Sequence, residues 1–192
     1  MRSISMFTAC ALVVMGCGTK DATPAADSAT PVADSATPNA TMATAGAGAI
    51  VHDASGRELG ALTLADGNGG ITVSGTLRGL PPGEHGIHIH MTGACDAPAF
   101  TTAGGHWNPT TKMHGSQNPQ GPHFGDLMNI TVGADSSATV QLTTMGGTLN
   151  GADMLMDADG AAVVVHAAGD DYKTDPSGNS GDRVACGVIN KS

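Results

Sequence analysis

The sequence predicts an all-β domain, a sandwich or barrel of short strands. The composition favours this class, because the chain has 28 glycines while only 13% of its residues are charged and 3% are aromatic. Small residues, glycine turns and short β-branched runs suit a β domain better than a helical bundle. The hydrophobic pattern agrees, because short apolar runs recur along the chain and clusters of turn residues separate them.

Eight segments carry the strand pattern. Apolar and polar residues alternate in 70–78, where Ile71 and Val73 share a face, and again in 138–142. The run 161–165 is apolar throughout, as expected of a strand that is buried on both sides. Turn clusters lie at 54–56, 66–70, 81–83 and 157–160. We therefore expect strands at 46–53, 58–65, 70–78, 85–91, 126–132, 138–142, 161–166 and 184–189.

Two long segments, 92–125 and 167–183, do not fit this pattern of short strands and tight turns. Both are rich in glycine, proline and polar residues. Long loops on a rigid β scaffold often carry function. We therefore expect the functional side chains to be concentrated there.

The first 17 residues are interpreted as an export signal. One arginine precedes an apolar run that is too short to span a bilayer. Residues 14–17, Val-Met-Gly-Cys, resemble the lipobox of bacterial lipoproteins, in which the cysteine is lipidated and becomes the new N-terminus. We expect a lipid on Cys17, and the alternative is a plain secretory signal that is cut nearby. The lipid would anchor the protein to a membrane of the cell envelope or periplasm.

Residues 18–45 are interpreted as a disordered tether, which leaves 46–192 as the folded domain. The heptad PAADSAT at 24–30 recurs as PVADSAT at 31–37. This repeat contains a proline every seven residues and almost nothing to bury, so it is neither a coiled coil nor a packed element. The tether is typical of a linker that holds a domain away from a surface.

The formal net charge of −9 excludes nucleic acid as a partner, because the chain has no block of lysines or arginines to meet phosphates. Two of the four cysteines, Cys95 and Cys186, lie in the predicted domain. Export into an oxidising compartment favours a single disulfide between them. The alternative is a pair of free buried thiols.

The stretch HGIHIH, residues 85–90, places three histidines in six residues. Side chains alternate along a strand, so His88 and His90 share a face and can converge on one ion. His85 has the opposite parity and is better interpreted as a hydrogen-bonded structural residue. This pair alone is weak support for a metal site.

The long loop that follows strengthens the metal hypothesis. His106, His114, His123 and Asp126 lie within twenty-one residues, a set of nitrogen and oxygen ligands that zinc prefers. His166 ends the apolar run 161–165. Only His52 lies outside the pattern, and we expect it to be a surface or strand residue.

Together these motifs resemble the copper/zinc superoxide dismutase family. The resemblance covers residues 45–192 and is carried by LPPGEHGIHIH, GGHWNP, the segment 114–126, VVVHAAGDD and GDRVACGVI. It implies an eight-stranded Greek-key β-barrel or sandwich, immunoglobulin-like, with two long functional loops.

The resemblance also implies the metal ligands. It implies copper on His88, His90, His106 and His166, and zinc on His106, His114, His123 and Asp126. His106 would then join both ions through its two ring nitrogens. Asp170 would link a copper histidine to a zinc histidine by hydrogen bonds, which fixes the ring tautomers.

The implied reaction is the dismutation of superoxide to oxygen and hydrogen peroxide. Arg183 would hold the anion near the copper, and His106 would supply a proton. Lys112 and Lys173 are further candidates for attracting the substrate despite the acidic net charge. Whether the protein is a monomer or a homodimer stays open.

Two other functions are compatible with parts of the pattern. A non-catalytic copper-binding or copper-buffering lipoprotein on the same fold would be expected to lack Arg183 or a ligand, and all are present. A zinc hydrolase would need an open zinc position, whereas four protein ligands fill this one.

Overall fold

The computed structural model describes residues 46–151 and 154–192, and the all-β prediction is confirmed. The predicted signal peptide, Cys17 and the whole of the predicted tether lie outside these residues. The strands are β1 (Ala47–Asp53), β2 (Glu58–Gly67), β3 (Gly70–Arg78), β4 (Gly83–His85), β5 (Ile87–His90), β6 (Ile130–Val132), β7 (Ser137–Thr143), β8 (Ala161–His166) and β9 (Arg183–Lys191). One 3-10 turn, η1 (Thr101–Ala103), accompanies them. In the described part of the chain, no helix has the length and apolar character that a membrane crossing requires.

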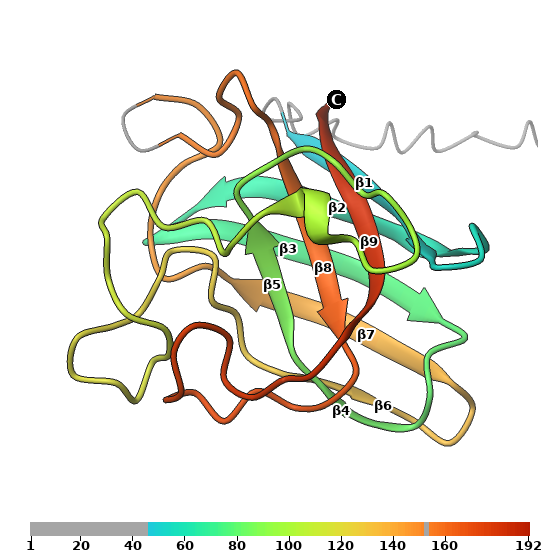
Figure 1. The fold of residues 1–192 in the computed structure, drawn as a ribbon. Helices are drawn as coiled ribbons and strands as arrows, with labels where there is room; N and C mark the ends of the chain where they lie inside the picture. Colours follow the sequence, from blue (N-terminus) through green and yellow to red (C-terminus); the bar gives the residue numbers. More distant parts are fainter. Residues whose placement is uncertain (1–45, 152–153) are drawn as a thin grey trace, which may run out of the picture. The chain divides into compact units, whose positions relative to one another are not determined.

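The strands form a curled antiparallel sheet (Figure 1). Seven of them pair in the order β5-β8-β9-β1-β2-β3-β7, and β4 pairs with β6. β4 runs directly into β5 at one edge of the large sheet, and β6 leads through a tight turn into β7 at the other edge. The β4–β6 pair therefore joins the two edges, as a barrel requires.

The predicted strand 85–91 is divided in two at Gly86, so the eight predicted strands become nine among the described residues. The backbone changes partners at this point. The Gly86 N–H donates to Ala168 at 2.8 Å and its carbonyl accepts from His166 at 2.8 Å, while β4 pairs with β6 and β5 with β8. Turn signals in the sequence cannot reveal a change of partner inside a strand.

The predicted strand 126–132 is too long, because only Ile130–Val132 is extended and paired. Asp126 instead forms a single bridge with His88, and its backbone N–H closes a turn on the carbonyl of His123 at 3.4 Å. The bounds of the six other predicted strands agree with the structure to within two residues.

The hydrophobic core fills the inside of the curled sheet. Alternate residues of β2 and β3 supply it, among them Leu62, Leu64, Ile71 and Val73. Burial of each such side chain contributes about 1.5–3 kcal/mol. All six residues of β8 are buried, which confirms the strand predicted to be covered on both sides. The core thus gives rigid support to β5, which carries His88 and His90, and to β8, which carries His166.

The two long loops lie against each other beside β5 and β8 (Figure 1). Gln117 donates from its backbone N–H to the carbonyl of Tyr172 at 3.0 Å, and Asn118 donates from its side chain to the carbonyl of Lys173 at 3.3 Å. The loops therefore support one another over the same part of the barrel.

Candidate metal centre

Four buried imidazoles converge beside the end of β8. β5 places His88 and His90 on one side, while Ile87 and Ile89 enter the core, as the alternation predicted. His166 ends β8, and the long loop brings His106 beside β5 through an isolated bridge to His90. One nitrogen from each of the four rings lies within 4.8 Å of the other three. The members of this group, which we call the four-histidine group, are His88, His90, His106 and His166.

Each ring in the four-histidine group leaves one buried nitrogen without a hydrogen-bond partner. These atoms are Nδ1 of His88 and Nε2 of His90, His106 and His166. In three rings the other nitrogen donates to an acceptor: His88 to Asp170 at 2.9 Å, His90 to the carbonyl of Gly104 at 3.0 Å, and His166 to the carbonyl of Gly181 at 3.1 Å. Unpartnered buried polar atoms are rare in folded proteins and need an explanation. Four of them aimed at one another fit a metal ion that accepts nitrogen ligands.

Burial keeps these imidazoles neutral. It lowers the pKa of His88 to about 3 and that of His166 to about 4, and it lowers the pKa of His90 well below its usual value. A metal binds only an unprotonated nitrogen. The group is therefore in the ligand form at neutral pH.

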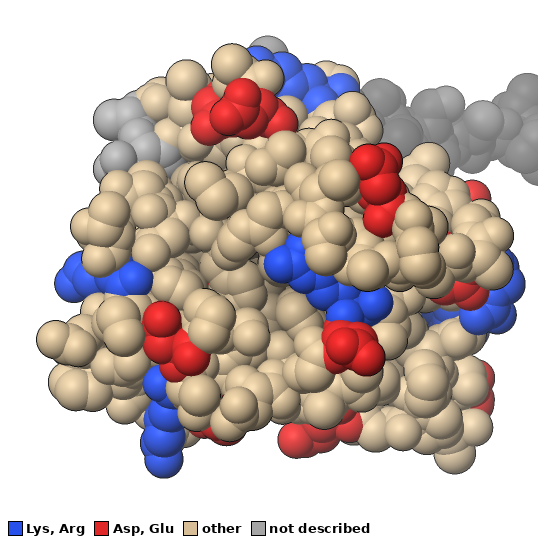
Figure 2. Space-filling model, in the orientation of Figure 1, with Lys and Arg blue, Asp and Glu red and all other residues tan. Residues whose placement is uncertain are grey.

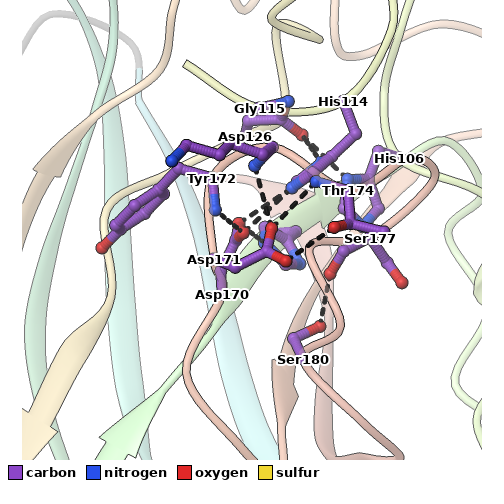
Figure 3. A network of polar contacts seen from close by, with 12 residues as sticks. His106, His114, Gly115, Asp126, Asp170, Asp171, Tyr172, Thr174, Ser177 and Ser180 are labelled. Carbon is purple, nitrogen blue, oxygen red and sulfur yellow. Dashed lines mark hydrogen bonds and ion pairs between the residues drawn. The ribbon is translucent and has the colours of Figure 1, made fainter. Parts of the chain in front are cut away.

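A second group gathers around one oxygen of Asp126 (Figure 3). Its Oδ1 lies 2.8 Å from Nδ1 of His106, 3.0 Å from Nδ1 of His114 and 3.1 Å from Nδ1 of His123. Nδ1 of His106 and Nδ1 of His123 are 3.4 Å apart. Ligands about 2.0–2.1 Å from a tetrahedral ion lie about 3.3 Å from one another, so these four atoms nearly have the spacing of a zinc site. We call this set the three-histidine–aspartate group.

Hydrogen bonds from the backbone orient the carboxylate of Asp126. Its other oxygen, Oδ2, accepts from the N–H groups of Gly115 at 2.8 Å and His123 at 3.0 Å. Burial favours the neutral acid, but the hydrogen bonds from His106, His114 and His123 hold the pKa of Asp126 below its usual range. The carboxylate is therefore ionised and correctly turned toward the three rings.

His106 belongs to both groups. Its Nε2 is one of the four unpartnered nitrogens, and its Nδ1 is 2.8 Å from Asp126. The ring centroid of His106 lies 4.1 Å from that of His88 and 5.1 Å from that of His114. All seven predicted ligands thus meet in two groups that share one ring.

Asp170 connects the two groups from behind the rings (Figure 3). Its Oδ2 accepts from Nε2 of His88 at 2.9 Å, and its Oδ1 accepts from Nε2 of His114 at 3.1 Å. These are the nitrogens that face away from the ligand atoms, so the carboxylate fixes which tautomer each ring adopts. Although burial opposes it, hydrogen bonds from His114 and His88 hold the pKa of Asp170 below its usual range.

Arg183 begins β9 next to the four-histidine group. Its guanidinium donates to the carbonyls of Phe100 and Gly104, both at 2.7 Å. The predicted disulfide between Cys95 and Cys186 is confirmed. It ties the loop that carries Phe100 to β9, so it supports the geometry of the arginine.

A cavity of about 620 Å³ opens over the four-histidine group, and Arg183 lines it with His90, His106 and His166. Lys112 and Lys173, the two other basic residues expected at its mouth, do not line it. Two acidic residues do, Asp157 and Asp159. Figure 2 shows basic and acidic side chains interspersed over this face, without a large area of one sign. Among the described residues, Arg183 is thus the only lysine or arginine that lines this cavity.

Three residues that no motif in the sequence marks also position the site. The Asn129 side chain donates to the carbonyl of Asp170 at 3.0 Å and accepts from its N–H at 2.8 Å. Asp175 accepts from the N–H of His114 at 2.7 Å. Gly178, at φ +64°, leaves the space that the carboxylate of Asp170 occupies, and an added Cβ there would collide with it. No spacing in the sequence marks these residues, because they act through tertiary contacts.

The two remaining histidines lie outside both groups. His85 is buried, with Nδ1 2.7 Å from the carbonyl of His166 and Nε2 2.9 Å from that of Pro81, so its predicted structural role is confirmed. His52 lies in β1 and is half-buried.

Comparisons with known proteins agree with this geometry. A family model described as copper/zinc superoxide dismutase matches residues 59–189. A Cu-Zn superoxide dismutase from Caulobacter vibrioides is 43% identical over 147 residues, which cover 74% of this chain and 84% of the relative. A second Cu-Zn superoxide dismutase, from Aquifex aeolicus, is 41% identical over 146 residues, which cover 74% of this chain and 85% of the relative.

Solved structures give the same result. A SOD-like protein from Bacillus subtilis superposes with a TM-score of 0.71 at 36% identity, over 73% of this chain and 96% of that one. The Cu/Zn superoxide dismutase from Brucella abortus superposes with a TM-score of 0.60 at 27% identity, and the match covers 73% of this chain and 97% of that one. With a matching family model, relatives above 40% identity and the shared barrel, the chain belongs to the copper/zinc superoxide dismutase family.

Proposed function

We propose that the protein is a superoxide dismutase that converts two superoxide anions and two protons into oxygen and hydrogen peroxide. The four-histidine group would hold copper, and the three-histidine–aspartate group would hold zinc. The observation that carries this proposal is the position of His106, whose two ring nitrogens face the two groups separately. A ring in that position would serve both metal sites as a ligand, whereas two unrelated metal sites would have no reason to share it.

The donor sets fit the two metals. Four imidazoles suit copper, and three imidazoles with one carboxylate suit zinc. Copper, when bound, supplies the one-electron redox chemistry that zinc lacks. The three-histidine–aspartate group has no open position, which supports a structural role for zinc and argues against a hydrolase.

The residues of the cavity would bind and orient the substrate. Arg183 offers a fixed positive charge and hydrogen-bond donors to a small anion. Partial burial lowers the pKa of Arg183, but a guanidinium stays charged at neutral pH. Because carbonyl groups of Phe100 and Gly104 hold two of its nitrogens, the guanidinium is already oriented before substrate arrives.

His106 would also take part in proton transfer. Its Nε2 faces the other imidazoles, its ring lines the cavity, and it accepts no hydrogen bond from the described residues. When Nε2 is not engaged as a copper ligand, a proton held on this atom would lie beside the substrate cavity and could pass to the reduced product. Asp126 holds Nδ1 on the opposite side and keeps the ring in place.

We further propose that the enzyme is lipid-anchored in the cell envelope. The support is the motif at residues 14–17 and the proline-containing repeat at 24–37 that follows it. Mass spectrometry of the mature protein should find an N-terminal, lipidated Cys17. An unmodified N-terminus downstream of Cys17 would contradict the anchor and leave the proposed activity untouched.

Metal analysis paired with a superoxide assay tests the activity. The purified protein should contain equimolar copper and zinc, and a copper chelator should abolish superoxide consumption. Replacement of His106 by alanine should remove the activity while the fold, measured by circular dichroism, persists. A folded, fully loaded sample that leaves superoxide unconsumed would contradict the proposal and favour copper storage instead.

A further inference from the structure

Methionines make up most of the exposed large hydrophobic residues in the described part of the chain. Six large hydrophobic side chains are exposed there, and five are methionines: Met91, Met113, Met128, Met145 and Met154, with Ile50 the sixth. Scattered exposed hydrophobic residues are ordinary on protein surfaces. Two of these methionines are not scattered, because Met91 and Met154 both line the cavity above the four-histidine group.

Met91 directly follows His90 at the end of β5, and its side chain is 52% exposed. It lies over the glycines that lead to His106. A Cβ added to Gly104 would lie 3.0 Å from Cγ and 3.6 Å from the sulfur of Met91, and one added to Gly105 would lie 4.0 Å from that sulfur. Gly104 therefore leaves room for the Met91 side chain between β5 and the loop that carries the shared imidazole.

Met154 reaches the same cavity from the connection between β7 and β8, and its side chain is 42% exposed. Its neighbour Leu155 is buried and donates from its N–H to the carbonyl of Thr148 at 2.8 Å, which turns Met154 outward. Further along, the N–H of Gly93 donates to the carbonyl of Asp159 at 2.9 Å. This contact holds the β7–β8 connection beside the residues that follow Met91.

The cavity rim also carries Asp157 and Asp159. Two carboxylates here repel an anionic substrate, so the proposed reaction does not account for them. They attract a cation, since charges at the mouth of a cleft raise the local concentration of the opposite charge. The rim therefore combines two thioethers, which are soft ligands selective for copper(I), with a negative potential that draws cations inward.

We propose that Met91 and Met154 form an entry site that captures copper(I) and passes it to the four-histidine group. The imidazoles of that group are buried, and three of them line the cavity floor, so the cavity is a direct route from solvent. Zinc and hard cations are poor partners for thioethers, so this site also discriminates between the two metals at the entrance. The inference rests on the proposed function only in taking the four-histidine group as the copper site.

Transfer kinetics test the entry site. Metal-free protein is mixed anaerobically with the copper(I)–bicinchoninate complex, and the loss of the colour of that complex reports uptake. The variant Met91→Leu/Met154→Leu should take up copper(I) about tenfold more slowly, which corresponds to about 1.4 kcal/mol in the barrier to transfer. Its final copper content should equal that of the wild type. The matched control, Met128→Leu/Met145→Leu, changes two exposed methionines that do not line the cavity and should load at the wild-type rate.

A measurement on the unmodified sequence keeps the test independent of any variant. With methionine methyl groups labelled with carbon-13 and the four-histidine group already filled with copper(I), a further equivalent of copper(I) should shift the Met91 and Met154 signals. Zinc(II), which binds imidazoles but not thioethers, should not shift them in the same way. Methyl signals that do not shift with copper(I), or that shift equally with copper(I) and zinc(II), would overturn the proposal. Equal rates of copper(I) uptake in the two double variants would also overturn it.

The acidic residues give a separate readout. Asp157→Asn/Asp159→Asn should slow copper(I) uptake and reduce its dependence on salt, and an unchanged uptake rate would remove the electrostatic part of the proposal. Failure of the proposed function is distinguishable, because a loaded protein that does not consume superoxide could still show these differences in uptake.

Discussion

Replacement of Asp170 by asparagine tests how the two groups are coupled. The carboxylate accepts from His88 at 2.9 Å and from His114 at 3.1 Å, and also from the N–H of Tyr172 at 2.7 Å. An amide has only one acceptor oxygen, so its NH₂ group would face one of the three N–H groups of His88, His114 and Tyr172. One hydrogen bond to a charged group is therefore lost, and its donor is left buried.

The magnitude follows from that lost bond. A hydrogen bond to a charged group contributes about 1.5–3 kcal/mol, and each 1.4 kcal/mol changes an affinity about tenfold. We expect the lost hydrogen bond to weaken zinc binding more than copper binding. His88 is fixed by a core strand, whereas His114 lies in a loop and depends on its contacts with Asp126, Asp170 and Asp175. Zinc affinity should fall about 10–100-fold, and copper affinity should change less.

Competition with a chromophoric zinc chelator at constant pH measures this change. Asp171→Asn is the matched control, because Asp171 is the exposed neighbour and bonds only to residues of its own loop. The control should keep wild-type zinc affinity. Zinc affinities of Asp170→Asn and the wild type that agree within about twofold would refute the positioning role of Asp170.

Three further outcomes are expected. Arg183→Glu should lower superoxide turnover and its dependence on ionic strength with metal content intact, and loss of both metals would show instead that the arginine is structural. Cys95→Ser/Cys186→Ser opens a cross-link between residues 91 positions apart and should lower the free energy of unfolding by on the order of 4 kcal/mol. Turnover should fall as well, because the loop that holds Arg183 is released, and unchanged stability in urea would contradict this expectation. Hydrogen bonds from Thr174 lower the pKa of Asp171 to about 2, so the loop contacts of this residue should persist above pH 4 and be lost as the pH falls through 2. Hydrogen exchange at the Thr174 amide measures this loss, and Asp171→Ala should show the unprotected rate at every pH.

The sequence predicted the strands well for physical reasons, and the residues that it named as metal ligands do meet in two groups. β5 is four residues long, and its alternation alone placed Ile87 and Ile89 in the core and the two histidines on the other side. The seven ligands could be identified because metal-binding side chains are rare and chemically specific. Their partition between two ions came from the resemblance, since spacing along a loop does not determine which side chains meet.

What the sequence could not predict depends on tertiary contacts. The division of the strand at Gly86 arises from hydrogen bonds to residues about eighty positions away. Asn129 and Gly178 act only because the second loop folds onto the first. Lys112 and Lys173, named as further candidates for attracting the substrate, do not line the cavity, because charge alone says nothing about which loop faces the opening.

Anomalous X-ray diffraction at the copper and zinc absorption edges of metal-loaded crystals tests the central claim most directly. Two separate peaks should appear, copper at the four-histidine group and zinc at the three-histidine–aspartate group, with the His106 ring between them. A single ion, exchanged metals, or a His106 ring that contacts neither peak would contradict it.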